Sequence, residues 1–209
     1  MTAPERAVTL DDAGREQVRP ILDAFRRHHP TAPVEIIERA FVEARRLHEG
    51  QLRKSGDPYI SHPVEVARLL ADYGLDAETI AAALLHDTVE DTGAVLDEMV
   101  EQFGATTAAL IDGVTKLDRV KFSNREQAQA ATIRKMVVAM ARDVRVLLIK
   151  LVDRLHNIRT IDPLPPEKQE RIARETIEVY APLAHRLGVQ EVKHEMEDRC
   201  FAILYPRRH

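Results

Sequence analysis

The fold class is decided by VRVLLIKLVDRLHNIR, the stretch that runs from Val144 to Arg159. Its first nine residues are rich in valine, leucine and isoleucine, and on their own they fit a buried strand. The apolar pattern continues through Leu155 and Ile158 at helical spacing, with Asp153 inside the run. A buried central helix is therefore the favoured interpretation, and a buried strand is the alternative.

The rest of the chain also favours helices. Only 8 of the 209 residues are glycine, and good helix formers dominate the composition. Apolar periodicity and capping signals divide the chain into about ten helices, which makes the expected fold class all-α. The predicted helices cover residues 12–29, 34–50, 63–74, 77–91, 95–103, 106–117, 124–141, 144–159, 167–187 with a kink near Pro182, and 189–204.

Composition and charge narrow the class of protein. Hydrophobic residues make up 44% and charged residues 31%, as in soluble globular proteins. The net charge of −4 argues against direct nucleic-acid binding, which is typical of basic surfaces. Cys200 is the single cysteine, so an internal disulfide framework and a cysteine-based zinc site are excluded. No apolar run is long enough to span a membrane and no signal peptide is visible, so we expect a cytoplasmic protein without membrane contact.

Titratable side chains crowd the end of one predicted helix. His86 follows the apolar run 80–85, and Asp87, Glu90 and Asp91 come directly after it. On a continuous helix His86 and Glu90 share a face, and so do Asp87 and Asp91. Carboxylates this close repel one another unless a cation lies among them. One interpretation is a solvated helix end. The other is a divalent metal at His86 and Asp87, with Glu90 and Asp91 as catalytic residues that handle water and protons.

Two further residues extend this set. His62 precedes Pro63, which suits the start of a helix, so His62 should lie at a helix mouth. Asp153 lies in the apolar stretch, and a buried carboxylate needs a partner, which is either Arg154 or Arg159 or the same cation. A mixed nitrogen and oxygen ligand set of this kind suits Mn²⁺, Fe²⁺ or Zn²⁺. The four candidate metal ligands are His62, His86, Asp87 and Asp153.

Five longer motifs resemble the hydrolase domain of the RelA/SpoT homologues, in the HD superfamily of metal-dependent phosphohydrolases. They are RKSGDPYISHP at 53–63, LLHDTVEDT at 84–92, GVTKL at 113–117, DRLHNIRT at 153–160 and YAPLAHRLG at 180–188. The motifs stand in the order of that family. The resemblance implies an HD-type helical domain around a buried metal site. It assigns residues 1–19 to a partly disordered N-terminal tail or first helix, and 20–209 to the hydrolase domain. We expect this domain to be the N-terminal part of a longer bifunctional protein with a C-terminal synthetase domain, and a free-standing small alarmone hydrolase is the alternative.

The resemblance also implies an activity and a site. The family removes the 3′-pyrophosphate of the alarmones ppGpp and pppGpp with Mn²⁺, giving GDP or GTP and pyrophosphate. It implies that His62, His86, Asp87 and Asp153 hold the Mn²⁺, and that Glu90 and Asp91 serve the attacking water. It implies a nucleotide pocket in which Arg53 lies against the guanine base, together with Lys54, Ser55, Asn157 and Thr160.

Two alternatives stay open at this point. One is an HD-type phosphohydrolase that acts on another nucleotide, and the other is a regulatory module whose hydrolase site is silenced. The remaining histidines are interpreted without catalysis. His156 and His185 are expected to support the structure, and the histidines at 28, 29, 48, 194 and 209 are expected to be solvated.

Overall fold

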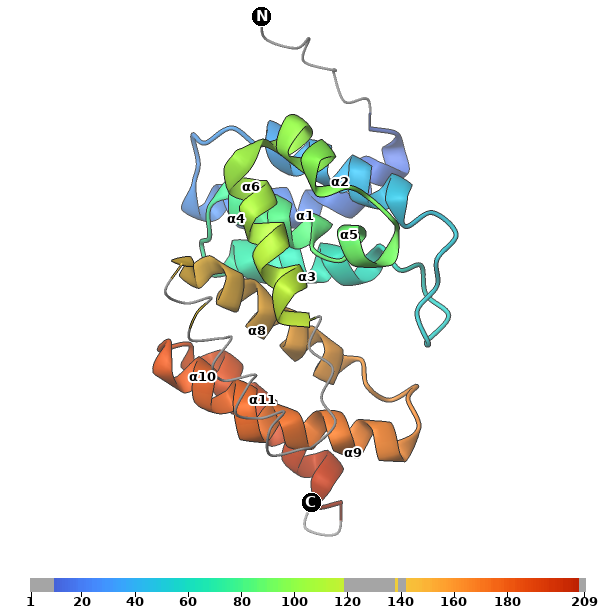
Figure 1. The fold of residues 1–209 in the computed structure, drawn as a ribbon, viewed down its shortest axis with the longest axis vertical. Coiled ribbons are helices and arrows are strands. Elements are labelled where there is room, and N and C mark those ends of the chain that lie inside the picture. The colour runs from blue at the N-terminus through green and yellow to red at the C-terminus, as the bar shows by residue number, and fades with distance from the viewer. Residues whose placement is uncertain (1–9, 119–137, 139–141, 207–209) are drawn as a thin grey trace, which may run out of the picture. The chain divides into compact units, whose positions relative to one another are not determined.

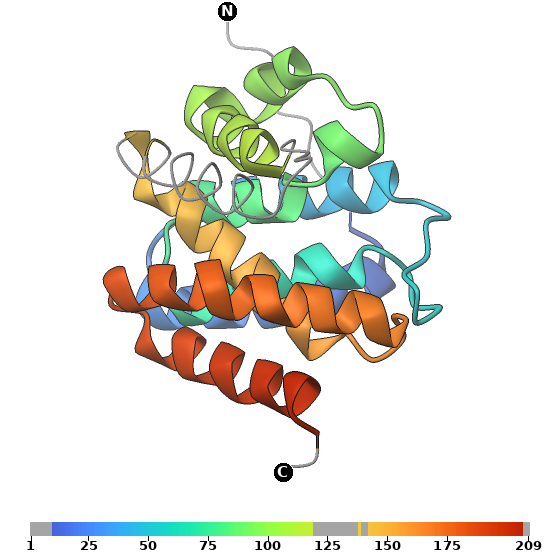
Figure 2. The ribbon, with the colours of Figure 1, turned by 60° about the horizontal axis from the view of Figure 1, so that its bottom comes forward.

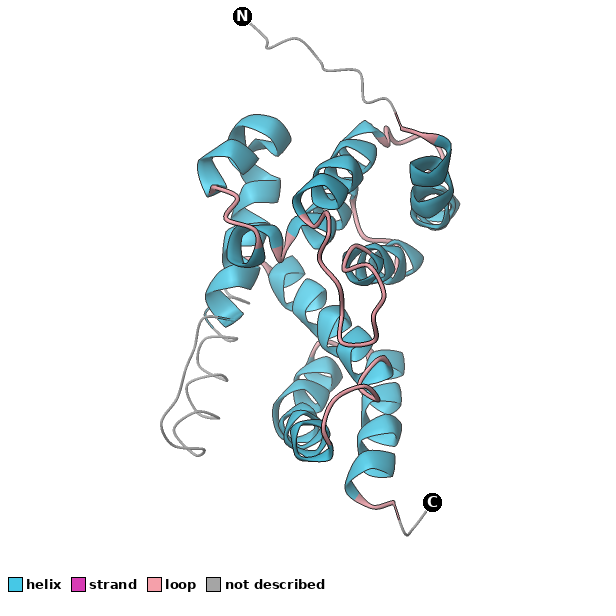
Figure 3. Cartoon of the chain, turned by 90° about the vertical axis from the view of Figure 1, so that its right-hand side faces the viewer, coloured by secondary structure: helices cyan, strands magenta, loops and turns pink. Residues whose placement is uncertain are grey.

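The computed structural model describes residues 10–118, 138 and 142–206. These residues form helices and loops without a strand (Figure 3), and their one isolated β-bridge joins Leu52 to Pro58. The all-α prediction is confirmed, whereas the helix expected over 124–141 lies almost entirely outside the described residues. In the described ranges, no helix has the length and apolarity that crossing a membrane requires.

The chain divides into two compact units, which are described separately. The first contains Met1–Gln51 and Tyr59–Ile111, and the second contains Leu52–Pro58 and Asp112–His209. The predicted boundary at residue 20 falls inside the first helix of the first unit and stays a prediction.

The first unit is built around a short apolar helix. Its helices are α1 (Asp12–His28), α2 (Glu35–Leu47), α3 (Ser61–Asp72), α4 (Ala77–Leu85), α5 (Thr88–Asp91) and the first part of α6 (Leu96–Asp118) (Figure 1). Every residue of α4 from Thr79 to Leu85 is buried, and α4 packs against both α2 and α3. A helix that is apolar on all sides is stable only inside a core, so α4 carries the residue that follows it, His86, into the interior.

Side-chain caps and one glycine set the helix ends of this unit. Asp11 accepts a hydrogen bond from the Gly14 amide at 2.7 Å, and Asp76 accepts one from the Thr79 amide at 3.0 Å. Aspartate is one of the residue types most favoured at this position, so the sequence itself specifies both helix starts. The two helices predicted at 95–103 and 106–117 correspond to the two stretches of α6, which a kink at Gly104 separates, where φ is 85°. Glycine adopts this left-handed conformation without the strain of a side chain.

The second unit is organised by α8 (Val144–Arg159), so the central segment is a helix as predicted. The other helices are α9 (Pro166–Glu175), the π-helical turn η1 (Thr176–Tyr180), α10 (Ala181–Arg186) and α11 (Gln190–Leu204). Figure 2 shows α11 alongside the run of α9, η1 and α10. The core joins one face of α8 to η1, α10 and α11 through Leu147, Leu151, Leu155, Val179, Tyr180, Ala184, Val192 and Met196. The π-helical turn η1 ends two residues before Pro182, where the sequence predicts a kink. Proline cannot donate to the helical ladder, and π-helical turns occur inside helices at such interruptions.

Several predicted helix boundaries are wrong, among them the end of the helix expected over 34–50, which lies at Leu47. The helix expected over 77–91 ends at Leu85, and α5 begins only at Thr88. The hydroxyl of Thr88 donates to the carbonyl oxygen of Leu85 at 2.7 Å, and this bond satisfies a carbonyl at the end of α4. His86 therefore lies at a helix end and does not share a continuous helical face with Glu90. In addition, α3 begins at Ser61, two residues before the expected start.

Candidate metal centre and nucleotide-contacting residues

Three of the four predicted metal ligands lie together in the first unit. Each of His62, His86 and Asp87 offers one ligand atom, and these atoms all lie within 4.8 Å of one another. Nε2 of His86 is 3.0 Å from Oδ1 of Asp87, and Nε2 of His62 is 3.7 Å from Oδ2 of Asp87. The two imidazole rings are buried, whereas the Asp87 side chain keeps 21% of its exposure. The site therefore has buried nitrogen donors and a carboxylate that solvent can reach.

The hydrogen bonding of His86 tests whether these residues fit a cation. Nδ1 of His86 lies 2.7 Å from the carbonyl oxygen of Ala83. A carbonyl only accepts, so Nδ1 carries the proton and Nε2 of the neutral ring presents its lone pair to Asp87. Two acceptors 3.0 Å apart require a positive charge between them, either a proton or a metal ion. The geometry and the mixed donor set fit a divalent metal.

Glu90 and Asp91, the predicted catalytic carboxylates, belong to the single turn of α5. Both are exposed, and the Asp91 amide bonds to the Asp87 carbonyl at 2.8 Å. Tyr59 lies between the two aspartates: its hydroxyl donates to Asp87 at 2.7 Å and lies 3.3 Å from Oδ2 of Asp91. The sequence therefore correctly placed Asp87 and Asp91 on one face, and the catalytic roles of Glu90 and Asp91 stay predictions.

The fourth predicted ligand, Asp153, belongs to α8 in the second unit. It is buried, and both of its oxygens accept hydrogen bonds: Lys150 donates to Oδ2 at 2.7 Å and Asn157 donates to Oδ1 at 2.8 Å. The expected salt bridge with Arg154 or Arg159 is wrong. Arg154 pairs with Glu175, and Arg159 pairs with Glu195. The place of Asp153 in the same ligand shell stays a prediction.

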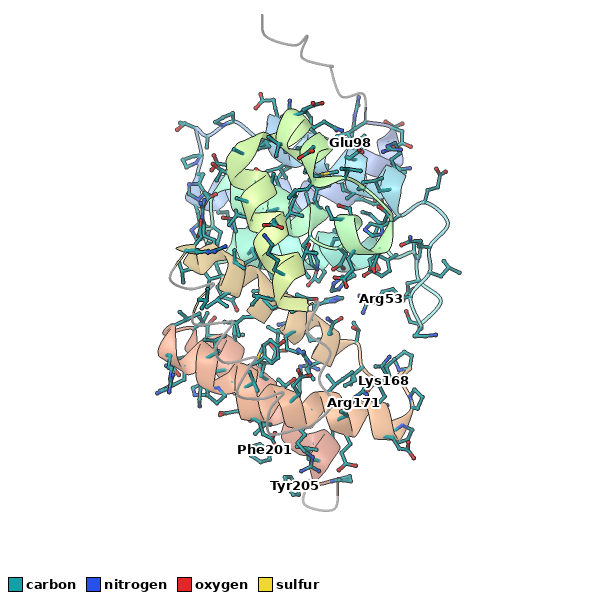
Figure 4. All side chains as sticks on the ribbon, viewed as in Figure 1. Arg53, Glu98, Lys168, Arg171, Phe201 and Tyr205 are labelled. Carbon is teal, nitrogen blue, oxygen red and sulfur yellow. The ribbon has the colours of Figure 1, made fainter. Side chains whose placement is uncertain are left out.

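Three of the predicted nucleotide-contacting residues meet in the second unit. Arg53, from the loop 52–58 (Figure 4), donates to the Thr160 hydroxyl at 3.0 Å and to Oδ1 of Asn157 at 3.5 Å. It also donates to Nδ1 of His156 at 3.4 Å. Lys54 and Ser55 are exposed in the same loop, and the Ser55 hydroxyl donates to Asp57 at 2.7 Å. Asn157 therefore connects Arg53 to Asp153, because its side chain accepts from Arg53 and donates to Asp153.

Several side chains at these sites were missed or misinterpreted. Lys150 precedes Asp153 by one helical turn, a spacing that could have identified it as the partner. Tyr59 stands inside a quoted motif, but nothing in its spacing relates it to Asp87. His48 was expected to be solvated, and this is wrong: it is 3% exposed and stacks on the Tyr59 ring at 4.6 Å. Its packing depends on the chain returning across the loop 52–58, which no local pattern reveals.

Together, the fold and this site define an all-helical protein with an adjacent His-Asp pair and a second histidine in position to share a divalent metal. The chain belongs to the HD domain family, whose model matches residues 40–190.

Relatives agree with the resemblance seen in the sequence. The chain is 55% identical over 201 residues to a probable GTP pyrophosphokinase of Mycobacterium leprae, with 94% of this chain and 25% of that protein covered. It is 52% identical over 180 residues to the bifunctional (p)ppGpp synthase/hydrolase SpoT of Escherichia coli, with 86% and 26% covered. It is 54% identical over 176 residues to a guanosine-3′,5′-bis(diphosphate) 3′-pyrophosphohydrolase of Vibrio cholerae, with 84% and 25% covered. The chain thus spans about a quarter of the length of these relatives.

A solved structure shares the fold. It is described as a metazoan ortholog of SpoT that hydrolyzes ppGpp, and it matches with a TM-score of 0.60 and 24% sequence identity. The match covers 85% of this chain and 98% of that one. This likeness confirms the HD-type helical fold.

Proposed function

We propose that this chain is a Mn²⁺-dependent 3′-pyrophosphohydrolase of ppGpp and pppGpp, which releases GDP or GTP and pyrophosphate. The observation that carries the proposal is the cluster of His62, His86 and Asp87, whose ligand atoms lie within 4.8 Å of one another. The names of the relatives support the substrate, because pyrophosphohydrolase and (p)ppGpp synthase/hydrolase both describe alarmone chemistry.

In this proposal the cation is held by His62, His86 and Asp87 of the first unit and by Asp153 of the second. When bound, a divalent metal polarises the phosphoryl oxygens and lowers the pKa of a coordinated water. The hydrogen bond from His86 to Ala83 holds that imidazole in the tautomer that can ligate. Mixed nitrogen and oxygen ligands are compatible with Mn²⁺, Fe²⁺ and Zn²⁺, and the resemblance favours Mn²⁺ among them.

The carboxylates of α5 handle protons. A water oxygen forms a bond to the phosphorus that carries O3′, and the bond from that phosphorus to O3′ breaks. Asp91, with Glu90 beside it, orients the water and accepts one of its protons. The pyrophosphate leaves, and O3′ ends with a proton, so that one water is consumed for each nucleotide and pyrophosphate formed.

Nucleotide recognition is assigned to the loop 52–58 and the end of α8. The guanidinium of Arg53 stacks on the guanine base, a role that suits its planar, always charged fork. Lys54 and Ser55 contact the phosphates, and Asn157 and Thr160 complete the pocket. Arg53 bonds to both Asn157 and Thr160, so these acceptors restrict the guanidinium before substrate arrives, which supports a shared role for the three residues.

The test is incubation of the purified chain with ppGpp and Mn²⁺ while pyrophosphate release is measured. We expect release that a chelator abolishes and that added Mn²⁺ restores, with GDP as the second product. GTP, ATP and GDP, none of which carries a 3′-pyrophosphate, serve as control nucleotides. Faster hydrolysis of one of these nucleotides than of ppGpp would reassign the substrate, and no pyrophosphate release from ppGpp in the presence of Mn²⁺ would contradict the proposal.

A further inference from the structure

Three side chains beside the metal centre have no role in the proposal above: His48, Gln51 and Tyr59. They flank the loop 52–58, and all three belong to the first unit. The amide of Tyr59 donates to the carbonyl of Gln51 at 2.9 Å, which closes the base of that loop. The three side chains are called the Tyr59 brace below.

The hydroxyl of Tyr59 is shared by two carboxylates with different tasks. It lies 2.7 Å from Oδ2 of Asp87, the candidate metal ligand, and 3.3 Å from Oδ2 of Asp91, the candidate acceptor of the water proton. A phenol has one proton to donate, and ionised carboxylates only accept. The hydroxyl can therefore donate its hydrogen to either carboxylate. Whichever carboxylate accepts it, the phenol oxygen stays close to the other one.

The backbone of Asp91 is held by the same brace. Nε2 of Gln51 donates to the carbonyl oxygen of Asp91 at 3.3 Å. This bond orients the Gln51 amide, so its Oε1 accepts from Nδ1 of His48 at 2.8 Å. His48 thus determines where Gln51 points, and Gln51 anchors the end of α5.

A stacking contact between His48 and Tyr59 completes the Tyr59 brace. The ring of His48 lies 4.6 Å from the Tyr59 ring with an interplanar angle of 26°, and His48 is 3% exposed. Contacts therefore run in a circuit from Tyr59 to the Asp91 carboxylate, through the Asp91 backbone to Gln51, and from His48 back to Tyr59. His48 is the buried member of this circuit, whereas Gln51 and Tyr59 are partly buried and Asp91 is exposed. The connected contacts restrict the rotamers of the groups that they join.

We infer that Tyr59, held by His48 and Gln51, is a positioning residue that couples the metal ligand Asp87 to Asp91. The inference rests on the proposed function and deepens it. Tyr59 orients Asp87 toward the imidazoles and keeps Asp91 at a constant distance from the cation and its water. Hydrogen-bonding partners of metal ligands commonly contribute 10- to 100-fold to metal affinity or activity.

The test compares Tyr59→Phe with the wild-type chain, by calorimetric titration with Mn²⁺ and by steady-state ppGpp hydrolysis at saturating Mn²⁺. We expect about 10-fold weaker Mn²⁺ binding, because Asp87 loses its donor, and about 10-fold lower kcat, because Asp91 loses its tether. KM should be unchanged, because the phenol is assigned no contact with the nucleotide. Tyr205→Phe is the matched control, since Tyr205 is half exposed in the second unit.

Gln51→Met separates the two effects. Gln51 contacts Asp91 and not Asp87 in the bonds described above, so this variant should lower kcat several-fold and leave Mn²⁺ affinity and KM unchanged. Combined with Tyr59→Phe, it should lower kcat by less than the product of the single effects, because both act on Asp91. If Tyr59→Phe does not fold, Gln51→Met alone tests the inference through its effect on kcat.

The outcomes distinguish the inference from the function on which it rests. A wild-type chain that neither binds Mn²⁺ nor hydrolyses ppGpp overturns the proposed function and the inference with it. An active wild-type chain with Tyr59→Phe equal to it in Mn²⁺ affinity and in kcat overturns the inference alone. A kcat fully restored at saturating Mn²⁺ overturns the coupling to Asp91.

Discussion

Each of the two units of this chain holds an aspartate that is a candidate metal ligand, and the two aspartates have different partners. In the first unit Asp87 faces the Nε2 atoms of two imidazoles and accepts a phenolic hydrogen. In the second unit Asp153 is buried against an ammonium at 2.7 Å and a carboxamide at 2.8 Å. An ammonium supplies a full positive charge, whereas a neutral imidazole lone pair supplies none.

This difference indicates which aspartate needs a bound metal ion as its counter-ion and which has a counter-ion within the protein. The lone pair of His86 and the charge of Asp87 gain from a divalent ion placed between them. The carboxylate of Asp153 already has an internal counter-ion, so its unit is expected to fold in the same way with or without metal. Metal removal should therefore act on the first site, and loss of Lys150 should act on the second.

The largest expected effect comes from Asp87→Ala. Loss of a partner of a metal ligand costs 10- to 100-fold, so loss of the ligand itself should reduce turnover by more than about 100-fold. Mn²⁺ should also stop raising the melting temperature, because the stabilisation by a bound ligand requires a site in the folded state. Calorimetry with Mn²⁺ and a hydrolysis assay check this. Retained turnover with wild-type Mn²⁺ affinity would show that Asp87 is no ligand.

Asp91→Asn should come next. The amide keeps the shape of the side chain but cannot accept a proton from water, so kcat should fall about 100-fold, within the usual range for general acid–base groups. Mn²⁺ affinity should stay within about 3-fold of wild type, since Asp91 is assigned no bond to the metal. Full activity in this variant would remove Asp91 from the proposed mechanism.

Lys150→Met removes the counter-ion of Asp153 in the second unit. It leaves Asp153 buried without its ammonium, so the free energy of unfolding should fall by about 3 kcal/mol in urea titrations with chelator present. Lys193→Met is the matched control, because Lys193 pairs with Glu197 at 2.8 Å on the surface of α11 and should cost below about 1 kcal/mol. Equal losses in the two variants would contradict the contrast drawn between the units.

Arg53→Ala should affect substrate binding alone. It removes the guanidinium that is assigned to stack on the guanine base, so KM for ppGpp should rise about 10-fold, the order of effect of losing a desolvated contact between a cation and an aromatic ring. Mn²⁺ affinity should be unchanged. Arg53→Lys should restore little, because an ammonium lacks the planar fork. A fall in kcat with unchanged KM would place Arg53 in the chemistry instead.

The smallest expected effect is on the stability of the second unit, whose free energy of unfolding should depend on pH through Glu195. Hydrogen bonds from Arg159 hold the pKa of Glu195 below its ordinary value of 4.5. The folded state therefore favours the carboxylate, and the resulting stability is present above pH 4.5 and is lost as the pH falls through the lower folded value. Glu195→Gln should destabilise by less than about 1 kcal/mol at pH 6. The difference from wild type should shrink as the pH falls below 4.5 and through the lower pKa of the folded state. A difference that grows on acidification would contradict this sign.

Local patterns predicted most of the fold, because helix starts and apolar faces depend on neighbours in sequence. Asp76 and Asp143 cap α4 and α8 as the sequence indicates. The break after Leu85 was missed because it depends on a hydroxyl bond from Thr88 that competes with a continuous helical pattern. For the site, residue type and order predicted the cluster of His62, His86 and Asp87. The brace of His48, Gln51 and Tyr59 could not be predicted, because its contacts span the loop 52–58.

The central claim is that one cation is shared by His62, His86 and Asp87. Anomalous X-ray diffraction from crystals of the chain grown with Mn²⁺ tests it most directly. The account predicts one strong manganese peak within bonding distance of Nε2 of both histidines and of an Asp87 oxygen. A peak elsewhere in the molecule, or none at these three side chains, would contradict it.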